Sequence, residues 1–181
     1  MNPYLLPGIS TARLRFRLLE AEDFVLCLPF FQDPRSHQYW DTQGKDPETL
    51  GREWFDKQMW RYAHGHGGAM ALIEKDTGKL VGWCGLLLQV VDGVEELEVG
   101  YSILPAHWKK GYATEAARRC IQFAFENQLA KSVISIIQIH NFPSQRVAGK
   151  NGLIRDAQTM HHGNPVYVYR IYPKDWTVSQ S

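Results

Sequence analysis

The chain has 181 residues, of which 44% are hydrophobic and 22% are charged, a balance typical of a soluble globular domain with one core. Its formal net charge is +1, so no basic excess drives non-specific binding, and we expect neither nucleic acid nor a membrane as a partner. The sequence therefore predicts a single domain over residues 1–181.

The first part of the chain predicts a strand, two helical segments and an antiparallel meander. Residues 11–18 alternate, with Leu14, Phe16 and Leu18 on one face of a half-buried strand. Helical segments are predicted at residues 20–31, with a break near Pro29, and at residues 47–62. Strands are predicted at residues 69–74, 80–91 and 95–104. Asp92-Gly93 is the strongest hairpin signal between the last two.

After Pro105 the hydrophobic period changes to that of a helix, predicted over residues 112–129. Residues 132–139 form a β-branched run that suits a buried strand, and the strand-helix-strand order calls for a right-handed crossover and a parallel pair. A short helix is predicted at residues 142–150, and further strands at residues 153–159 and 165–172. The fold class is therefore α+β, a mixed sheet of about seven strands with helices on both faces.

Cysteine and histidine are the residues that would suggest a metal. Cys27, Cys84 and Cys120 lie far apart in the sequence without metal-ligand spacing, and we interpret them as reduced, mostly buried thiols. His64-Gly65-His66 and His161-His162 have no third ligand nearby in sequence, so we interpret them as loop histidines that could touch substrate. We expect no metal.

The cellular location of the protein is predicted from the absence of two kinds of segment. No apolar run approaches the length of a transmembrane helix. Residues 1–8 lack the basic region and long apolar core of a secretory signal. The sequence therefore predicts a cytoplasmic protein.

The loop that enters the predicted helix at Tyr112 carries most of the chemical information. A helix N-terminus offers unpaired backbone N–H groups and a partial positive charge, both of which favour phosphate. Gly111 allows a close approach to the backbone, and Lys109 and Lys110 add positive charge. The segment favours a phosphate site, while an ordinary connection with solvated lysines is the alternative.

This loop, Trp108-Lys109-Lys110-Gly111-Tyr112-Ala113, resembles the pyrophosphate loop Q/R-x-x-G-x-G/A of the GNAT acetyltransferase superfamily, and within it the RimJ/RimL-like group. Trp in the first position is common in that group, whereas Gly usually stands in place of Lys109. Three further segments match in family order: Thr11-Ala12-Arg13-Leu14, Val99-Gly100-Tyr101 and Asn141-Phe142-Pro143-Ser144. The resemblance covers roughly residues 10–172 and implies a GNAT-like fold in which a splayed parallel pair of strands holds acetyl-CoA.

The resemblance also implies which residues bind the cofactor. The pyrophosphate would bind the loop backbone at Lys109, Lys110, Gly111, Tyr112, Ala113 and Thr114. Tyr101, Ser102 and Ile103 would hydrogen-bond the pantetheine amides as an added strand does, with plain sheet pairing as the alternative. Asn141 would hydrogen-bond the pantetheine from the far wall; it also suits a helix N-cap, and the two roles are compatible.

Two residues are candidates for the chemistry. Ser144 stands where the resemblance puts a donor to the leaving thiolate, although a surface serine in a helix first turn is the alternative. Glu98 is the candidate base, because a buried carboxylate on the central strand could accept the amine proton. The alternative is that Glu95, Glu96 and Glu98 form a solvated acidic run.

The predicted activity is transfer of acetyl from acetyl-CoA to a primary amine by direct attack in a ternary complex. A CoA-binding regulatory module of the same fold with little turnover is the alternative. The sequence leaves the amine open among a protein N-terminus, an amino acid, a polyamine and an amino sugar, and a homodimer is one option for assembly. In this family the acceptor groove would be built by residues 30–60 and 159–166; Tyr39 and Trp40, if they line it, suit an apolar or cationic acceptor.

Overall fold

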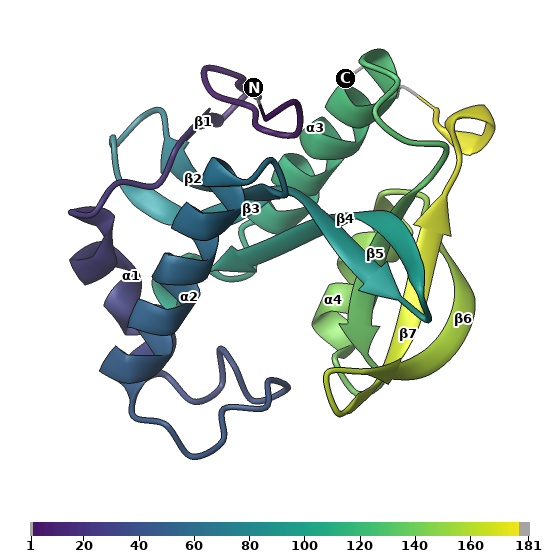
Figure 1. Cartoon of the computed structure of the whole chain (residues 1–181). Helices are drawn as coiled ribbons and strands as arrows, with labels where there is room; N and C mark the ends of the chain where they lie inside the picture. Colours follow the sequence, from purple (N-terminus) through teal and green to yellow (C-terminus); the bar gives the residue numbers. More distant parts are fainter. Residues whose placement is uncertain (1, 178–181) are drawn as a thin grey trace.

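The computed structural model describes residues 2–177, which form a seven-stranded mixed sheet in the order β1-β2-β3-β4-β5-β7-β6 (Figure 1). The strands are β1 Leu14–Arg17, β2 Gly67–Glu74, β3 Leu80–Val91, β4 Val94–Ile103, β5 Val133–Gln138, β6 Ile154–His161 and β7 Asn164–Ile171. Within these residues β4 and β5 pair in parallel, and the other neighbours pair antiparallel. The predicted mixed sheet, its meander and its parallel pair are confirmed.

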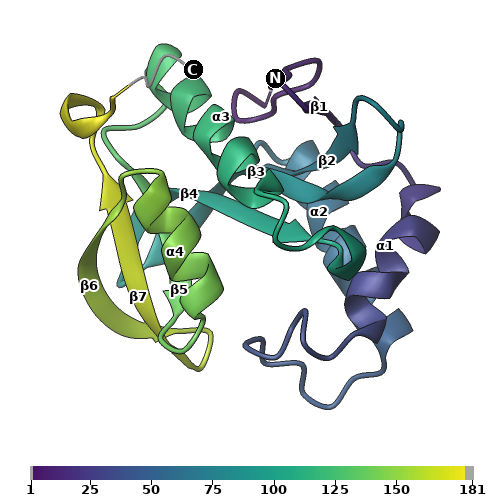
Figure 2. The same ribbon diagram turned by 180° about the vertical axis from the view of Figure 1, so that it is seen from behind.

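Helices cover both faces of the sheet. Helices α1 (Asp23–Gln32) and α2 (Pro47–Ala63) lie on one face, and α3 (Tyr112–Glu126) and α4 (Phe142–Lys150) lie on the other (Figures 1 and 2). Alternate strand residues serve two separate apolar cores: Leu97 and Val99 pack in the core with α3, and Trp83 packs in the core with α1 and α2. None of the helices within residues 2–177 combines the length and the apolarity that a bilayer crossing requires.

The β3–β4 hairpin sets the register of the central strands. Asp92 and Gly93 have φ angles of 49° and 79° between the paired residues Val91 and Val94, as a two-residue type I′ turn requires. The ladder then continues without a shift to Gly82 and Ile103. Glu98 therefore keeps the strict alternation of a regular strand, and no bulge turns its side chain.

Two local predictions on the α1–α2 side are wrong. Pro29 lies inside α1 and does not break it. The carbonyl that loses its amide partner is that of Val25, a residue that is 67% exposed, so water can satisfy this carbonyl. Leu18, predicted on the buried face of the first strand, is exposed because β1 ends at Arg17.

Two of the three cysteines meet in the core. The Sγ atoms of Cys84 on β3 and Cys120 on α3 lie 3.6 Å apart, although the residues are distant in sequence. All three cysteines are free and buried. Burial raises the pKa of Cys27 to about 12 and raises that of Cys84 as well, so these thiols are poor nucleophiles.

Candidate active site

The central parallel strands separate near their middle. β4 and β5 are in register at a single position, Glu98 opposite Ile134. Just beyond it the Ser135 hydroxyl donates to the Val99 carbonyl at 3.3 Å, so a side chain replaces the next backbone bond. From Gly100 onward, the edge of β4 that faces β5 is therefore not paired with a strand within the described residues. This matches the splayed pair predicted from the sequence.

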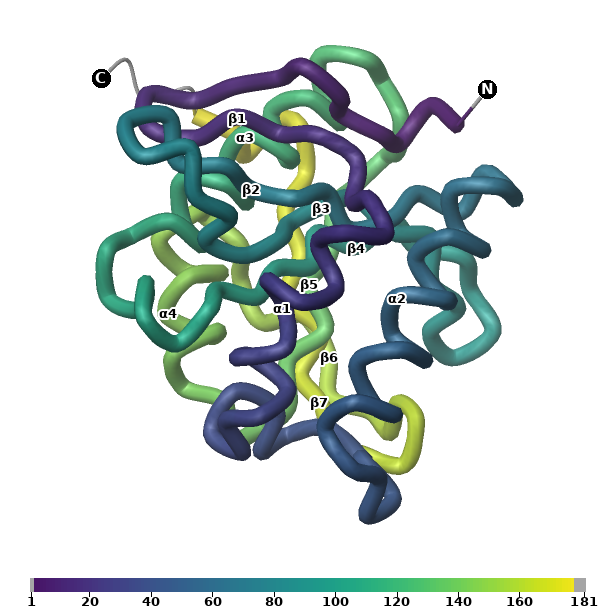
Figure 3. The backbone as a smooth tube through the Cα atoms, turned by 90° about the vertical axis from the view of Figure 1, so that its left-hand side faces the viewer, coloured from purple at the N-terminus to yellow at the C-terminus, as the bar shows by residue number. Residues whose placement is uncertain are grey.

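A cleft of about 470 Å³ occupies this separation, a size typical of small-molecule sites. Lys57 and Arg61 of α2 line it on one face of the sheet, and Asn141, the N-cap of α4, and Ser144 in its first turn line it on the other. The cleft therefore connects the two faces between β4 and β5. At the α2 end, the loop between α1 and α2 lies beside the β6–β7 hairpin, as the views of Figures 1 and 3 agree.

Glu98 points into the α2 side of the cleft. Its carboxylate accepts a 2.7 Å hydrogen bond from Gln89 Nε2 and a 3.3 Å bond from the Ile136 amide. Burial raises the pKa of Glu98, and these bonds together with nearby Arg61 and Lys57 only partly oppose that rise. Such a carboxylate holds a proton more readily than an exposed one, which suits a general base.

The neighbouring acids differ from Glu98. Glu96 forms an ion pair of 2.7 Å with Arg170 on β7, and Glu95 is exposed. Because Glu96 is paired and Glu98 lines the cleft, the interpretation of these two residues as part of a solvated acidic run is wrong.

Three of the predicted residues lie together on the α4 side. Tyr101 Oη lies 3.0 Å from Ser144 Oγ and donates to the Ser144 carbonyl at 3.1 Å. Burial raises the pKa of Tyr101 to about 12, so the phenol stays protonated near neutral pH. Asn141 Oδ1 caps α4 by accepting from the Ser144 amide at 3.2 Å. Ser144 therefore belongs to the cleft, and the Tyr101 hydroxyl is a site group that the sequence did not reveal.

Ser102 lines the cleft but Ile103 does not. The Ile103 side chain is buried in the core, and its carbonyl accepts a 2.7 Å bond from the indole of Trp108. Trp108 thereby fixes the start of the predicted pyrophosphate loop, which gives a structural reason for an indole at this position.

The loop presents open backbone amides. Lys109 and Gly111 both have left-handed backbones, with φ angles of 63° and 84°. The first helical bond of α3 is that from the Glu115 amide to the Gly111 carbonyl, and Gly111, as the N-cap residue, has no side chain to cap the helix. The amides of Tyr112, Ala113 and Thr114 are therefore available to an anion. The left-handed φ of Lys109 explains why Gly is usual at this position in the group that the loop resembles.

Arg13 of the segment before β1 holds this loop in place. Its guanidinium pairs with Glu115 at 2.6 Å, donates to the Lys110 carbonyl at 2.9 Å and lies 4.6 Å from the Tyr112 ring centroid. Burial alone would raise the pKa of Glu115, but hydrogen bonds from Thr11 and Arg13 outweigh it and lower the pKa. The Tyr112 side chain is buried, and its hydroxyl donates to Glu74. The group of Tyr112 that remains available to a phosphate is therefore its backbone amide.

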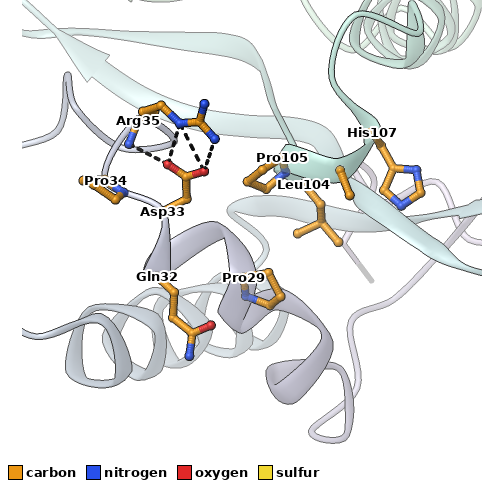
Figure 4. A pocket seen from close by; sticks show the side chains of 9 residues that line it. Pro29, Gln32, Asp33, Pro34, Arg35, Leu104, Pro105 and His107 are labelled. Carbon is orange, nitrogen blue, oxygen red and sulfur yellow. Dashed lines mark hydrogen bonds and ion pairs between the residues drawn. The ribbon is translucent and has the colours of Figure 1, made fainter.

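A second hollow lies beside the loop, between the end of α1 and the turn after β4 (Figure 4). Its walls include Pro29, Leu104 and Pro105, and Asp33 pairs with Arg35 at 2.6 Å on its rim. The charges of Asp33 and Arg35 on its rim pair with each other, and Gln32 and His107 are the other polar side chains of its largely apolar walls.

The histidines are placed without a metal-binding arrangement. Among residues 2–177 no group of three His, Cys, Asp or Glu side chains could hold a metal ion. His64 and His66 pack on Trp60, with ring centroids 4.6 and 4.9 Å away. His161 and His162 line the α2 end of the cleft.

A sheet that splays at a parallel pair, a cleft through the opening and an uncapped helix N-terminus are the features expected from the resemblance to acyl-CoA-dependent transferases. The model of the family described as Acetyltransferase (GNAT) domain matches residues 13–154. The protein YkkB of Bacillus subtilis is 31% identical over 163 residues, which cover 89% of this chain and 93% of YkkB. The chain belongs to the GNAT acetyltransferase family and is an enzyme of the acetyltransferase class.

Solved structures show the same fold. An acetyltransferase from Agrobacterium tumefaciens superposes with a TM-score of 0.78 at 25% identity, over 93% of this chain and 96% of that one. RimJ of Mycobacterium smegmatis in complex with CoA-disulfide gives a TM-score of 0.74 at 15% identity, over 93% and 85% of the two chains. The fold thus extends to RimJ-type acetyltransferases.

Proposed function

We propose that the protein transfers an acetyl group from acetyl-CoA to a primary amine by direct attack in a ternary complex. The observation that supports this most is the cleft through the sheet, which carries Glu98 on the α2 side and Ser144 on the α4 side. The open amides of Tyr112, Ala113 and Thr114, at the end of the loop that begins at Lys109, suit the pyrophosphate. Asn141, Tyr101 and Ser102 suit the pantetheine arm, so donor and acceptor would approach from opposite faces.

In the proposed reaction the amine nitrogen bonds to the carbonyl carbon of the thioester while the carbon–sulfur bond breaks. Glu98 accepts the amine proton, directly or through water. The hydroxyl of Ser144, itself in contact with Tyr101, donates a hydrogen bond to the leaving thiolate. The products are the N-acetyl amine and CoA, whose thiolate takes its proton from solvent.

The walls at the α2 end favour an apolar monoamine over a polyamine. Tyr39 and Trp40 line this end and offer aromatic faces. Lys57 and Arg61 also line it. Burial lowers the pKa of Lys57, and the positive charge of Arg61 lowers it further. Asp41 and Glu98 are carboxylates of the same lining, so the repulsion applies to a second ammonium that lies against α2, where it would meet Lys57 and Arg61.

Thiol release from acetyl-CoA should therefore be faster with phenethylamine or a peptide N-terminus than with spermidine at equal concentration. The control is acetyl-CoA hydrolysis without amine. Faster release with spermidine would contradict the acceptor class. If acetyl-CoA raises the melting temperature but no amine accelerates thiol release above the control, the regulatory CoA-binding module is the better assignment.

Ser144→Ala should lower kcat by about 5-fold or more while leaving the affinity for acetyl-CoA nearly unchanged. The hydroxyl acts on charge that develops in the transition state, and one such donor supplies roughly 1 to 3 kcal/mol. Single-turnover rates and titration of acetyl-CoA would separate the two quantities. An unchanged single-turnover rate would remove Ser144 from the mechanism.

A further inference from the structure

Side-chain hydrogen bonds link Glu98 to Gln89 and Gln89 to Arg61. Gln89 on β3 and Glu98 on β4 project to the same face of the sheet, diagonal to each other across the ladder. Gln89 Nε2 donates to Glu98 Oε2 at 2.7 Å, and Gln89 Oε1 accepts from Arg61 Nη2 at 3.2 Å. Because a guanidinium only donates and a carboxylate only accepts, this pairing fixes the orientation of the amide.

The Arg61 end of this link is anchored in the protein. Arg61 is 5% exposed, and its Nη1 donates to the carbonyls of His66 at 3.1 Å and Leu88 at 3.0 Å. A guanidinium held by two backbone carbonyls cannot follow a moving partner. Arg61 therefore holds the Gln89 amide in place, and the Gln89 amide holds the Glu98 carboxylate in place.

Other groups near Glu98 do not replace this link. Arg61 and Lys57 of α2 and Tyr101 of β4 are the charged or titratable groups that interact with it. Among the described residues Gln89 supplies its side-chain hydrogen bond, and the amide of Ile136 supplies a longer backbone bond.

We propose that Gln89 is a positioning residue for the acetyl transfer: it links Glu98 to the anchored Arg61 and holds the carboxylate toward the cleft. This rests on the proposed function, in which Glu98 accepts the proton of the amine. The bond from Gln89 stabilises the charged carboxylate, so it lowers the pKa of Glu98 against the rise caused by burial.

Gln89→Met keeps the length of the side chain and removes both hydrogen bonds. The pKa of Glu98 should rise, so the acid limb of kcat/KM should move to higher pH, by about one unit or more. The same amine is used for every variant, so its own titration is common to all profiles. Gln122→Met is the matched control: Gln122 makes a similar 2.7 Å bond to Glu126 on α3, away from the cleft, and its profile should be that of the wild type.

Two outcomes would contradict the proposal, and a second variant covers a failure of Gln89→Met to fold. An acid limb at the wild-type pH in Gln89→Met, with a lower melting temperature, would make Gln89 merely structural and overturn the inference. If Glu98→Gln itself keeps the wild-type profile, the base role in the proposed function fails first. Should Gln89→Met not fold, Gln89→Asn keeps the amide but is too short to reach both partners, and the same shift is expected.

Discussion

Gly111→Val is expected to abolish measurable binding of acetyl-CoA. Gly111 has a φ of 84°, a region that a β-branched residue rarely adopts, and a Cβ there would lie 3.4 Å from Arg13 Nη2. The substitution would displace the amides that we propose bind the pyrophosphate. Loss of two bonds to a charged group corresponds to a weakening of about 100-fold or more.

Thermal unfolding measures this loss directly, since a ligand at about 100 times its Kd adds roughly 2.7 kcal/mol of stability. Gly78→Val is the matched control, because Gly78 has a φ of 69° in an open turn with nothing within 4 Å of its Cβ position. Both variants should be less stable than the wild type, but acetyl-CoA should raise the melting temperature of Gly78→Val alone. A wild-type response in Gly111→Val would show that the loop does not bind the pyrophosphate.

Glu98→Gln should lower kcat/KM by about 100-fold or more near neutral pH, the range of a lost general base. The substitution keeps the shape and removes the basic oxygen. Burial raises the pKa of Glu98, so the wild-type rate should fall as pH drops through that raised value and the carboxylate becomes protonated. The defect of the variant should shrink as pH rises, because free amine and hydroxide become abundant.

Glu96→Gln provides the comparison on the same face of β4. Glu96 pairs with Arg170 and does not line the cleft, so this variant should lose stability while the folded enzyme keeps its rate. Equal pH-rate profiles for Glu98→Gln and the wild type, at nearly the same height, would assign the proton to a water chain or another residue. An equal loss of rate in both variants would indicate a general effect of charge on β4.

Local pattern predicted most of the fold. The Asp92-Gly93 turn, the period-2 strands around it and the helix from Phe142 to Lys150 each depend on residues close in sequence. Short-range sterics and hydrogen bonds decide such elements, so pattern alone is sufficient. The exceptions, Pro29 within α1 and the exposed Leu18, are places where the exposure of one face or the end of a strand overrode the local signal.

The sequence by itself thus determined the order of the elements, the loop at the start of α3 and the position of Ser144 in the first turn of α4. Tertiary structure alone decided that Glu98 lines a cleft, that Gln89 joins it to Arg61, and that Tyr101 reaches Ser144. These contacts join residues on different strands and helices, and the cleft that Glu98 lines lies where β4 and β5 separate. The pKa of Glu98 depends on its burial and on polar groups that arrive from β3, β5 and α2, and no spacing along a single strand records those distances.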